Sequence, residues 1–272
     1  MVMRFYSIGV YLFLYVPIGI IVLFSFNSGR HASDFQGFSV EWYGKALSNV
    51  FVIESLTTSL IIALSAATLS SLMGTAAALA LQQVRGRLRA LFDSLIYVSI
   101  MIPGIVIGIA TLVALVTVFD LLNPILAALW PEGVKPPKLS MGIASVIAAH
   151  TLFTMSLVIV LVRARIAGMD RALIEASQDL YASPWRTFVQ ITLPQLMPAI
   201  LAGFLLSFTF SFDDFIISFF VAGPNTTLPI YVFASIRRGI TPEVNAIGTM
   251  VLAVSLTLLI IAQLLLRRRD HR

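Results

Sequence analysis

The sequence contains no cysteine and few charged residues, and both absences narrow the kinds of protein it can be. Without cysteine there is no disulfide bond, no thiolate metal ligand and no thiol nucleophile. Charged residues make up only 11% of the 272 residues, whereas hydrophobic residues make up 58%. Soluble domains typically carry about 25% charged and about 45–50% apolar residues. The composition therefore excludes an ordinary soluble globule, and it also excludes a disordered chain, which needs the opposite bias.

Other missing patterns exclude further functions. The sequence has no Gly-x-x-x-x-Gly-Lys-Ser/Thr loop, so we expect no ATPase site and no bound cofactor in this chain. Its three histidines lie far apart and do not suggest a metal site. No internal repeat is visible, which weakens the case for an inverted-repeat carrier. The net charge of +5 lies mostly in short loops, which indicates a topology signal rather than a nucleic-acid partner.

The apolar residues are gathered into long blocks. About 20 apolar residues in a helix are needed to cross a bilayer core about 30 Å thick. The first apolar block, Phe5–Phe26, is longer than the apolar region of a signal peptide, and no clear cleavage site follows it. We therefore expect it to be a transmembrane helix. The sequence predicts an all-α, polytopic membrane protein with a single transmembrane domain over residues 1–272. Its six expected transmembrane helices are Phe5–Phe26, Val52–Leu81, Leu91–Phe119, Ser140–Val162, Leu196–Val221 and Val244–Leu266.

The distribution of Lys and Arg predicts the orientation of these spans. The segments on the side of the two termini carry twice as many Lys and Arg residues as the segments on the other side. Cytoplasmic loops are enriched in positive residues. We therefore expect a multi-pass protein with both termini in the cytoplasm.

The cytoplasmic loop of about residues 163–195 is too patterned to be a simple connector. Asp170 is placed as the N-cap of a helix that carries Ser177 on its apolar side. Ser183 and Pro184 form a second helix start, with Ser as the cap and Pro at the first helical position. The loop is predicted to form two short helices joined by a turn. It could rest on the membrane face or serve as a docking element for a soluble partner.

The same loop resembles a known motif. Glu175-Ala176-Ser177, followed at the family's spacing by Ile191-x-Leu193-Pro194, is similar to the EAA loop of ABC-importer permeases. Ser177 replaces the second Ala, and Tyr181 stands where the family has Gly. A Gly at a turn supplies a positive φ that is unfavourable for a bulky side chain. Either this turn has ordinary dihedral angles or the strain at Tyr181 is tolerated.

The resemblance implies a fold and a set of partners. Such a chain has the type I ABC importer permease fold, lies in the bacterial plasma (inner) membrane, and pairs with a second homologous permease. Two ATPase subunits carry the ATP and Mg, and an extracytoplasmic substrate-binding protein delivers the cargo. The residues that the resemblance places against the ATPase are Glu175, Ala176, Ser177, Tyr181, Ala182 and Ser183.

The fifth span contains two adjacent acids, Asp213 and Asp214. Carboxylates are costly in a bilayer, so they are expected to face a cavity or a subunit interface rather than lipid. On a continuous helix, Gly203, Ser207, Ser211, Asp214 and Ser218 share one narrow stripe, and Asp213 points about 100° away. The stripe is either a cavity wall or a packing seam, and the acid favours the cavity. The candidate substrate-pathway residues are Asp214, Asp213, Ser207, Ser211 and Glu243.

An acidic lining favours a cationic cargo. The sequence also resembles the second permease of spermidine/putrescine transporters, which implies import of polyamines. The stretches that carry this resemblance are Leu206–Asp214, Val221–Pro224, Leu228-Pro229, Pro242–Ala246 and the outer-loop pair Trp42-Tyr43.

Several alternatives remain open from the sequence. The chain could be an ABC permease for another small solute, such as a different amine, a phosphonate or iron. It could be a stand-alone ion-coupled carrier in which Asp213, Asp214 or His150 carries protons, or a membrane assembly factor that transports nothing. His150 itself is either a proton or substrate group or a satisfied buried histidine. Pro103 and Gly104 in the third span indicate either a packing kink or a gate.

Overall fold

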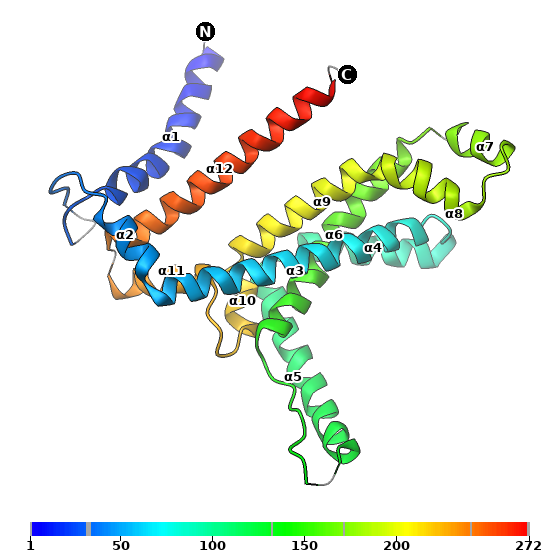
Figure 1. Ribbon diagram of the computed structural model, residues 1–272, viewed down its shortest axis with the longest axis horizontal. Helices are drawn as coiled ribbons and strands as arrows, with labels where there is room; N and C mark the ends of the chain where they lie inside the picture. The colour runs from blue at the N-terminus through cyan, green and yellow to red at the C-terminus, as the bar shows by residue number, and fades with distance from the viewer. Residues whose placement is uncertain (1, 31–33, 132, 171, 240, 271–272) are drawn as a thin grey trace. The chain divides into compact units, whose positions relative to one another are not determined.

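The computed structural model describes residues 2–30, 34–131, 133–170, 172–239 and 241–270. In these ranges the regular structure is helical, apart from one isolated β-bridge between Asn27 and Phe38. The chain divides into two compact units, one of residues 1–54 and 231–272 and the other of residues 55–230. Figure 1 labels the helices in chain order. The all-α class predicted from the sequence is confirmed.

The first unit contains α1 (Val2–Ser25), α2 (Glu41–Ser48) and α12 (Pro242–Asp270). Helix α1 packs beside α12, drawn blue and red in Figure 1. The most apolar stretch of α1 is not buried within the protein. A long helix with an unburied apolar surface is stable when lipid surrounds it.

The second unit contains most of α3 (Val50–Ala80), α4 (Gly86–Met101), α5 (Gly104–Leu129) and α6 (Ile143–Ala167). It continues with α7 (Ala172–Asp179), α8 (Pro184–Thr187), a π-helical turn η1 (Phe188–Thr192) and α9 (Leu193–Asp213). It ends with α10 (Ile216–Val221) and the start of α11 (Leu228–Arg238).

The core of the second unit forms around α6. A Cβ atom added to Gly74 of α3 would lie 2.8 Å from Val158 of α6, and one added to Gly203 of α9 would lie 3.3 Å from the same side chain. Both helices therefore approach α6 closely, as small residues permit in membrane proteins. On the cytoplasmic side of this core in the predicted topology, Arg163 of α6 pairs with Asp93 of α4.

Among the residues that the structure describes, five helices are long and apolar enough to cross a membrane. They are Met3–Ser25, Val50–Ala80, Gly104–Leu129, Ile143–Ala167 and Pro184–Asp213. The first, second and fourth predicted spans are confirmed as single helices of this kind. Helix α12 covers the sixth predicted block.

The prediction of a continuous third span over Leu91–Phe119 is wrong. Helix α4 ends at Met101, and α5 begins at Gly104 and runs to Leu129. Pro103 has no N–H to continue the helix, and it also disfavours helical dihedral angles at the preceding residue. Ile102 accordingly takes an extended conformation, with φ −68° and ψ 133°. The proline causes a break between two helices rather than a kink within one.

The prediction of a continuous fifth span over Leu196–Val221 is also wrong. Helix α9 ends at Asp213, Asp214 is extended with φ −70° and ψ 120°, and α10 begins at Ile216. The Asp214 carboxylate accepts a hydrogen bond from the Ser218 backbone N–H at 2.9 Å, in the manner of a helix cap. The short acidic side chain thus offers the first turn of α10 a partner that the interrupted helix cannot supply.

Candidate functional site

A cavity of about 640 Å³ lies in the second unit where the two broken helices meet. This volume is in the range of small-molecule sites. Within a membrane, non-helical backbone is tolerated where it lines a cavity or is buried in protein. The cavity therefore accounts for the two stretches of non-helical backbone, which line it. The lining residues are Ile100, Ile102 and Gly104 from the first break, Asp213–Ile217 from the second, and Phe153, Thr209 and Phe210.

The two aspartates of the second break both line this cavity, but their surroundings differ. Asp213, the last residue of α9, is exposed, and its carboxylate has neither a hydrogen bond nor an ion pair to any residue in the described ranges. The side chain of Asp214 is 20% exposed and is held by neighbouring groups. The sequence placed them 100° apart on one helix. The break changes that geometry, because Asp214 lies outside α9.

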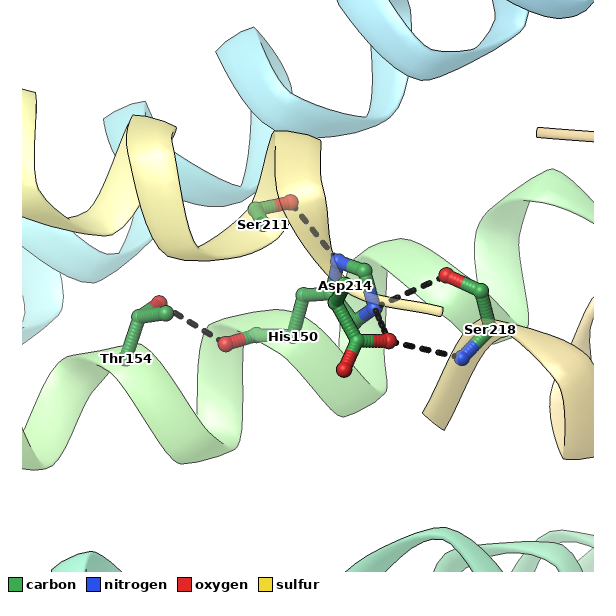
Figure 2. Close-up of polar contacts among 5 residues, drawn as sticks. All are labelled: His150, Thr154, Ser211, Asp214 and Ser218. Carbon is green, nitrogen blue, oxygen red and sulfur yellow. Dashed lines mark hydrogen bonds and ion pairs between the residues drawn. The ribbon is translucent and has the colours of Figure 1, made fainter. Parts of the chain in front are cut away.

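His150 of α6 is the centre of the contacts that hold Asp214 (Figure 2). The residue is 1% exposed, and both of its ring nitrogens have partners. Nδ1 lies 2.7 Å from Oγ of Ser211 on α9. Nε2 lies 3.2 Å from Oδ2 of Asp214 and 3.2 Å from Oγ of Ser218 on α10. One imidazole therefore contacts both sides of the break between α9 and α10.

The chemistry of these groups indicates which atoms donate. An ionised carboxylate can only accept hydrogen bonds, so the proton shared with Asp214 belongs to Nε2 of His150. In the neutral ring Nδ1 is then an acceptor, and the Ser211 hydroxyl donates to it. This arrangement satisfies the buried imidazole without a net positive charge. It matches the interpretation of His150 as a satisfied buried histidine.

Polar contacts continue from His150 toward α3. The Thr154 hydroxyl donates to the carbonyl oxygen of His150 at 2.7 Å, and Oγ of Ser70 lies 2.6 Å from Oγ1 of Thr154. All three residues are buried. Buried polar groups that are fully partnered fix the relative positions of the helices that carry them. Helices α3, α6, α9 and α10 are thus connected around the acidic end of the cavity.

The remaining predicted pathway residues fall in different places. Ser211 belongs to the His150 contacts. Ser207 is buried, and its hydroxyl has no hydrogen-bond partner within the part of the chain that the structure describes. Glu243 belongs to the other unit, where its Oε1 accepts a hydrogen bond from Nδ2 of Asn49 at 2.8 Å. The same amide donates to the hydroxyl of Tyr231 at 3.1 Å.

Sequence reasoning missed two parts of the site. The contact between His150 and Asp214 joins residues 64 positions apart, so no local pattern could reveal it. The aromatic part of the wall, Phe153, Phe210 and Phe215, was indistinguishable from ordinary apolar span residues. The proline-glycine pair at residues 103–104 was the available signal, because a proline-induced break inside a span needs a cavity or protein around it.

The predicted helical hairpin in the loop of residues 163–195 is present as α7 and α8. Oδ1 of Asp170 accepts a hydrogen bond from the backbone N–H of Ala172 at 2.9 Å, which confirms its capping role. The Ser183 hydroxyl oxygen accepts from the backbone N–H of Arg186 at 3.4 Å, and Pro184 occupies the first turn of α8. Both predicted helix starts are therefore confirmed.

The turn after α7 shows whether Tyr181 adopts ordinary or left-handed dihedral angles. Its φ is +56°, so a bulky residue occupies the left-handed region that usually takes Gly. The backbone N–H of Ala182 donates to the Ser177 carbonyl at 3.1 Å, and that of Tyr181 donates to the Gln178 carbonyl at 2.9 Å. This pair of bonds is the Schellman motif of a helix C-terminus. The strain at Tyr181 is tolerated because the motif fixes the turn.

The six residues expected to face an ATPase do not share one environment. Tyr181 is 97% exposed, and the side chains of Glu175, Ala176 and Ser183 are exposed, while Ala182 is half-buried. Ser177 does not lie on this exposed surface. It is buried, and its hydroxyl lies 2.7 Å from Oγ1 of Thr187, so it joins α7 to α8 instead.

Comparison with known proteins agrees with the resemblance stated from the sequence. A family model described as "Binding-protein-dependent transport system inner membrane component" matches residues 68–272. The spermidine/putrescine transport system permease protein PotC of Escherichia coli (strain K12) is 35% identical over 260 residues, which cover 95% of this chain and 91% of PotC. The putrescine transport system permease protein PotI of the same strain is 36% identical over 243 residues, 88% of this chain and 82% of PotI.

A solved structure supports the same fold. A chain of a bacterial ABC transporter involved in the import of the acidic polysaccharide alginate aligns with a TM-score of 0.75 at 17% identity, covering 98% of this chain and 94% of that one. At this identity the likeness concerns the fold alone. Together with the family match and the relatives, it places the chain among the binding-protein-dependent transport system inner membrane components: it is a multi-pass permease of an ABC importer and not an ATPase.

Proposed function

We propose that this permease imports polyamines such as spermidine and putrescine, which an extracytoplasmic binding protein delivers. The observation that carries the proposal is the acidic wall of the cavity. Asp213 is exposed there, and no described residue pairs with it. A cationic ammonium group is the natural counterpart of such a carboxylate. The 35% identity to PotC over 95% of the chain supports the same cargo class.

The aromatic side chains in the wall fit the rest of a polyamine. Phe153 and Phe210 form an edge-to-face pair with ring centroids 6.0 Å apart, and Phe215 also lines the cavity. Aromatic faces attract ammonium groups and also pack against methylene chains. A cargo with charged ends and an apolar chain would meet complementary groups in this cavity. A phosphonate would instead meet a carboxylate of the same sign.

The proposed membrane arrangement has six spans, with α12 as the sixth and both termini in the cytoplasm. Its support is the positive-residue bias of the sequence and the family membership of the chain. The complete transporter is proposed to contain this chain as one permease domain over residues 1–272. A second permease and two ATPase subunits complete it, and the ATPase subunits bind the ATP and Mg.

The hairpin of α7 and α8 is the proposed ATPase contact. Glu175, Ala176, Tyr181, Ala182 and Ser183 would lie on or beside the contact surface, and Ser177 would hold the hairpin together. Large apolar side chains beside them support docking, because Leu180 is 82% exposed and Trp185 is 71% exposed. A contiguous patch of exposed apolar side chains is typical of an interaction surface. Closure of the ATPase dimer would move this hairpin and so change access to the cavity.

The test is uptake of labelled putrescine and spermidine into proteoliposomes that contain the whole complex, with ATP inside and binding protein outside. Omitting either ATP or the binding protein should abolish uptake. The panel should include another amine, a phosphonate and iron, because these are the cargoes of the alternative permease functions. ATP-dependent uptake of one of these in place of polyamines would refute the cargo. Uptake by this chain alone would refute the ABC mechanism and favour an ion-coupled carrier.

A further inference from the structure

The two adjacent aspartates of the cavity have opposite relations to the protein around them. Oδ2 of Asp214 accepts from the Ser218 backbone N–H at 2.9 Å and lies 3.2 Å from Nε2 of His150. The carboxylate of Asp213 is without a hydrogen bond or ion pair anywhere in the described ranges, although it lines the same cavity. Because both residues are acids in neighbouring positions, composition alone gives no reason for this division.

We propose that His150 is a positioning residue that holds Asp214 across the break between α9 and α10 and leaves Asp213 as the carboxylate available to a cation. The assignment of Asp213 rests on the cationic cargo proposed above. The assignment of His150 and Asp214 as a latch does not depend on the cargo.

His150 is well placed for this role because it is itself immobilised. It is 1% exposed, and the Ser211 hydroxyl holds its Nδ1 from the α9 side. Its Nε2 faces the Asp214 carboxylate and the Ser218 hydroxyl (Figure 2). A fixed donor directed at a carboxylate defines where that carboxylate lies. Ser211 and Ser218 stand on opposite sides of the break, so the imidazole ties the two helix ends together.

Asp214 has a structural task that a substrate ion would disturb. It supplies the acceptor for the backbone N–H of Ser218, a residue that is 1% exposed. A buried N–H without an acceptor is costly. A cation that drew the Asp214 carboxylate into the cavity would break this bond and the His150 contact. Asp213 has no such contacts to lose, so it is the carboxylate that can serve a transient ligand.

The latch can be tested without transport, because the chain contains no cysteine. A single cysteine at Ile217, which lines the cavity just after the break and is only 2% exposed, reports opening of the break through its labelling rate with a thiol reagent. In the assembled complex, His150→Leu and Asp214→Ala should each accelerate labelling at least fivefold. The double variant should be no faster than Asp214→Ala alone, because Asp214→Ala already removes the contact with His150. His150→Gln, which retains a donor, should restore part of the slow rate.

Matched controls distinguish loss of the His150–Asp214 contact from a general destabilisation of the protein. Thr151→Val alters a buried neighbour on the same helix whose hydroxyl has no partner in the described part of the chain, so it should leave labelling unchanged. Asp213→Ala should also leave it unchanged. Unchanged labelling in His150→Leu, or acceleration by Asp213→Ala equal to that by Asp214→Ala, overturns the latch.

Uptake kinetics test the division of roles. Asp213→Asn should raise the KM for polyamine at least tenfold in the presence of His150. In the His150→Leu background Asp214 keeps only its contact with Ser218 and is freer to serve the cargo, so the same substitution should raise KM less than threefold. A merely structural role of His150 would not produce this compensation. A KM that Asp213→Asn leaves unchanged overturns Asp213 as the cation ligand, and the labelling result still decides the latch separately.

Discussion

Replacing Tyr181 with glycine should stabilise the α7–α8 hairpin. Tyr181 holds a φ of +56°, and an L-residue pays about 1–2 kcal/mol for left-handed backbone. Glycine removes that strain but loses about 0.5–1 kcal/mol through its greater freedom in the open state. The side chain of Tyr181 is 97% exposed, so little packing within the chain is lost. The net stabilisation therefore lies between about 0 and about 1.5 kcal/mol, with a central value of about 0.75 kcal/mol.

Amide hydrogen exchange of the full chain in detergent measures this change locally. The backbone N–H groups of Tyr181 and Ala182 donate to the carbonyls of Gln178 and Ser177, so their exchange reports opening of the turn. The central gain of about 0.75 kcal/mol slows exchange about three- to fourfold. Gln178→Gly is the matched control, because the same residue type inside the exposed helix α7 should destabilise it by about 1 kcal/mol and accelerate exchange.

The outcome that refutes the reasoning is faster exchange in Tyr181→Gly, in the same direction as Gln178→Gly. The left-handed backbone would then not be a strained feature of this turn. ATPase binding gives an independent reading of the same variant. If the exposed ring of Tyr181 contacts the ATPase, Tyr181→Gly should weaken co-purification even though the hairpin itself is more stable.

Three further substitutions test other parts of the structure. Glu175→Lys should abolish transport by weakening ATPase docking while membrane insertion remains intact, and normal uptake with normal co-purification would contradict the hairpin's role. Gly74→Ala places a Cβ 2.8 Å from Val158, so it should cost about 1–3 kcal/mol of stability, measured by thermal unfolding in detergent, with rescue by Val158→Ala. Ser177→Ala leaves the buried Thr187 hydroxyl without its partner and should cost about 1–3 kcal/mol of local stability in amide exchange, largely restored by adding Thr187→Val. Failure of either second substitution to rescue its partner would show that the cost arises elsewhere.

The features that could be predicted from sequence are those determined by residues close together in the chain. Apolar block length located the helices, and the capping residues Asp170 and Ser183 located the starts of the hairpin helices. The breaks were harder to predict. Pro103 marked one, but a proline within an apolar block can kink a helix or end it, and only its surroundings decide between them. No residue type marked the break at Asp214, because the acceptor needed by Ser218 is visible only once α10 is in place.

The sequence predicted that the site contains two aspartates, but it did not predict which of them is bound by the surrounding protein. An aspartate pair within an apolar span signals a cavity on energetic grounds alone. Which acid is committed to the protein depends on His150, which lies on a different helix and comes close only after α6 packs against α9 and α10. Ser177 shows the same limit in the hairpin. The family motif counts it among the docking residues, whereas its burial depends on Thr187 across the turn.

The division between the two aspartates gives a physical reason for a cation to enter the cavity and to leave it. A carboxylate within a bilayer costs up to roughly 2.5–3.5 kcal/mol on insertion scales, and less where water reaches it. The contacts of Asp214 with His150 and with Ser218 offset that cost within the protein. Asp213 lacks such contacts among the described residues, so a cationic cargo would supply the compensation. Transport requires that this affinity differ between conformations. The break beside Asp213 is the element whose rearrangement would change the distance between its carboxylate and the aromatic wall, and therefore the affinity for the cargo.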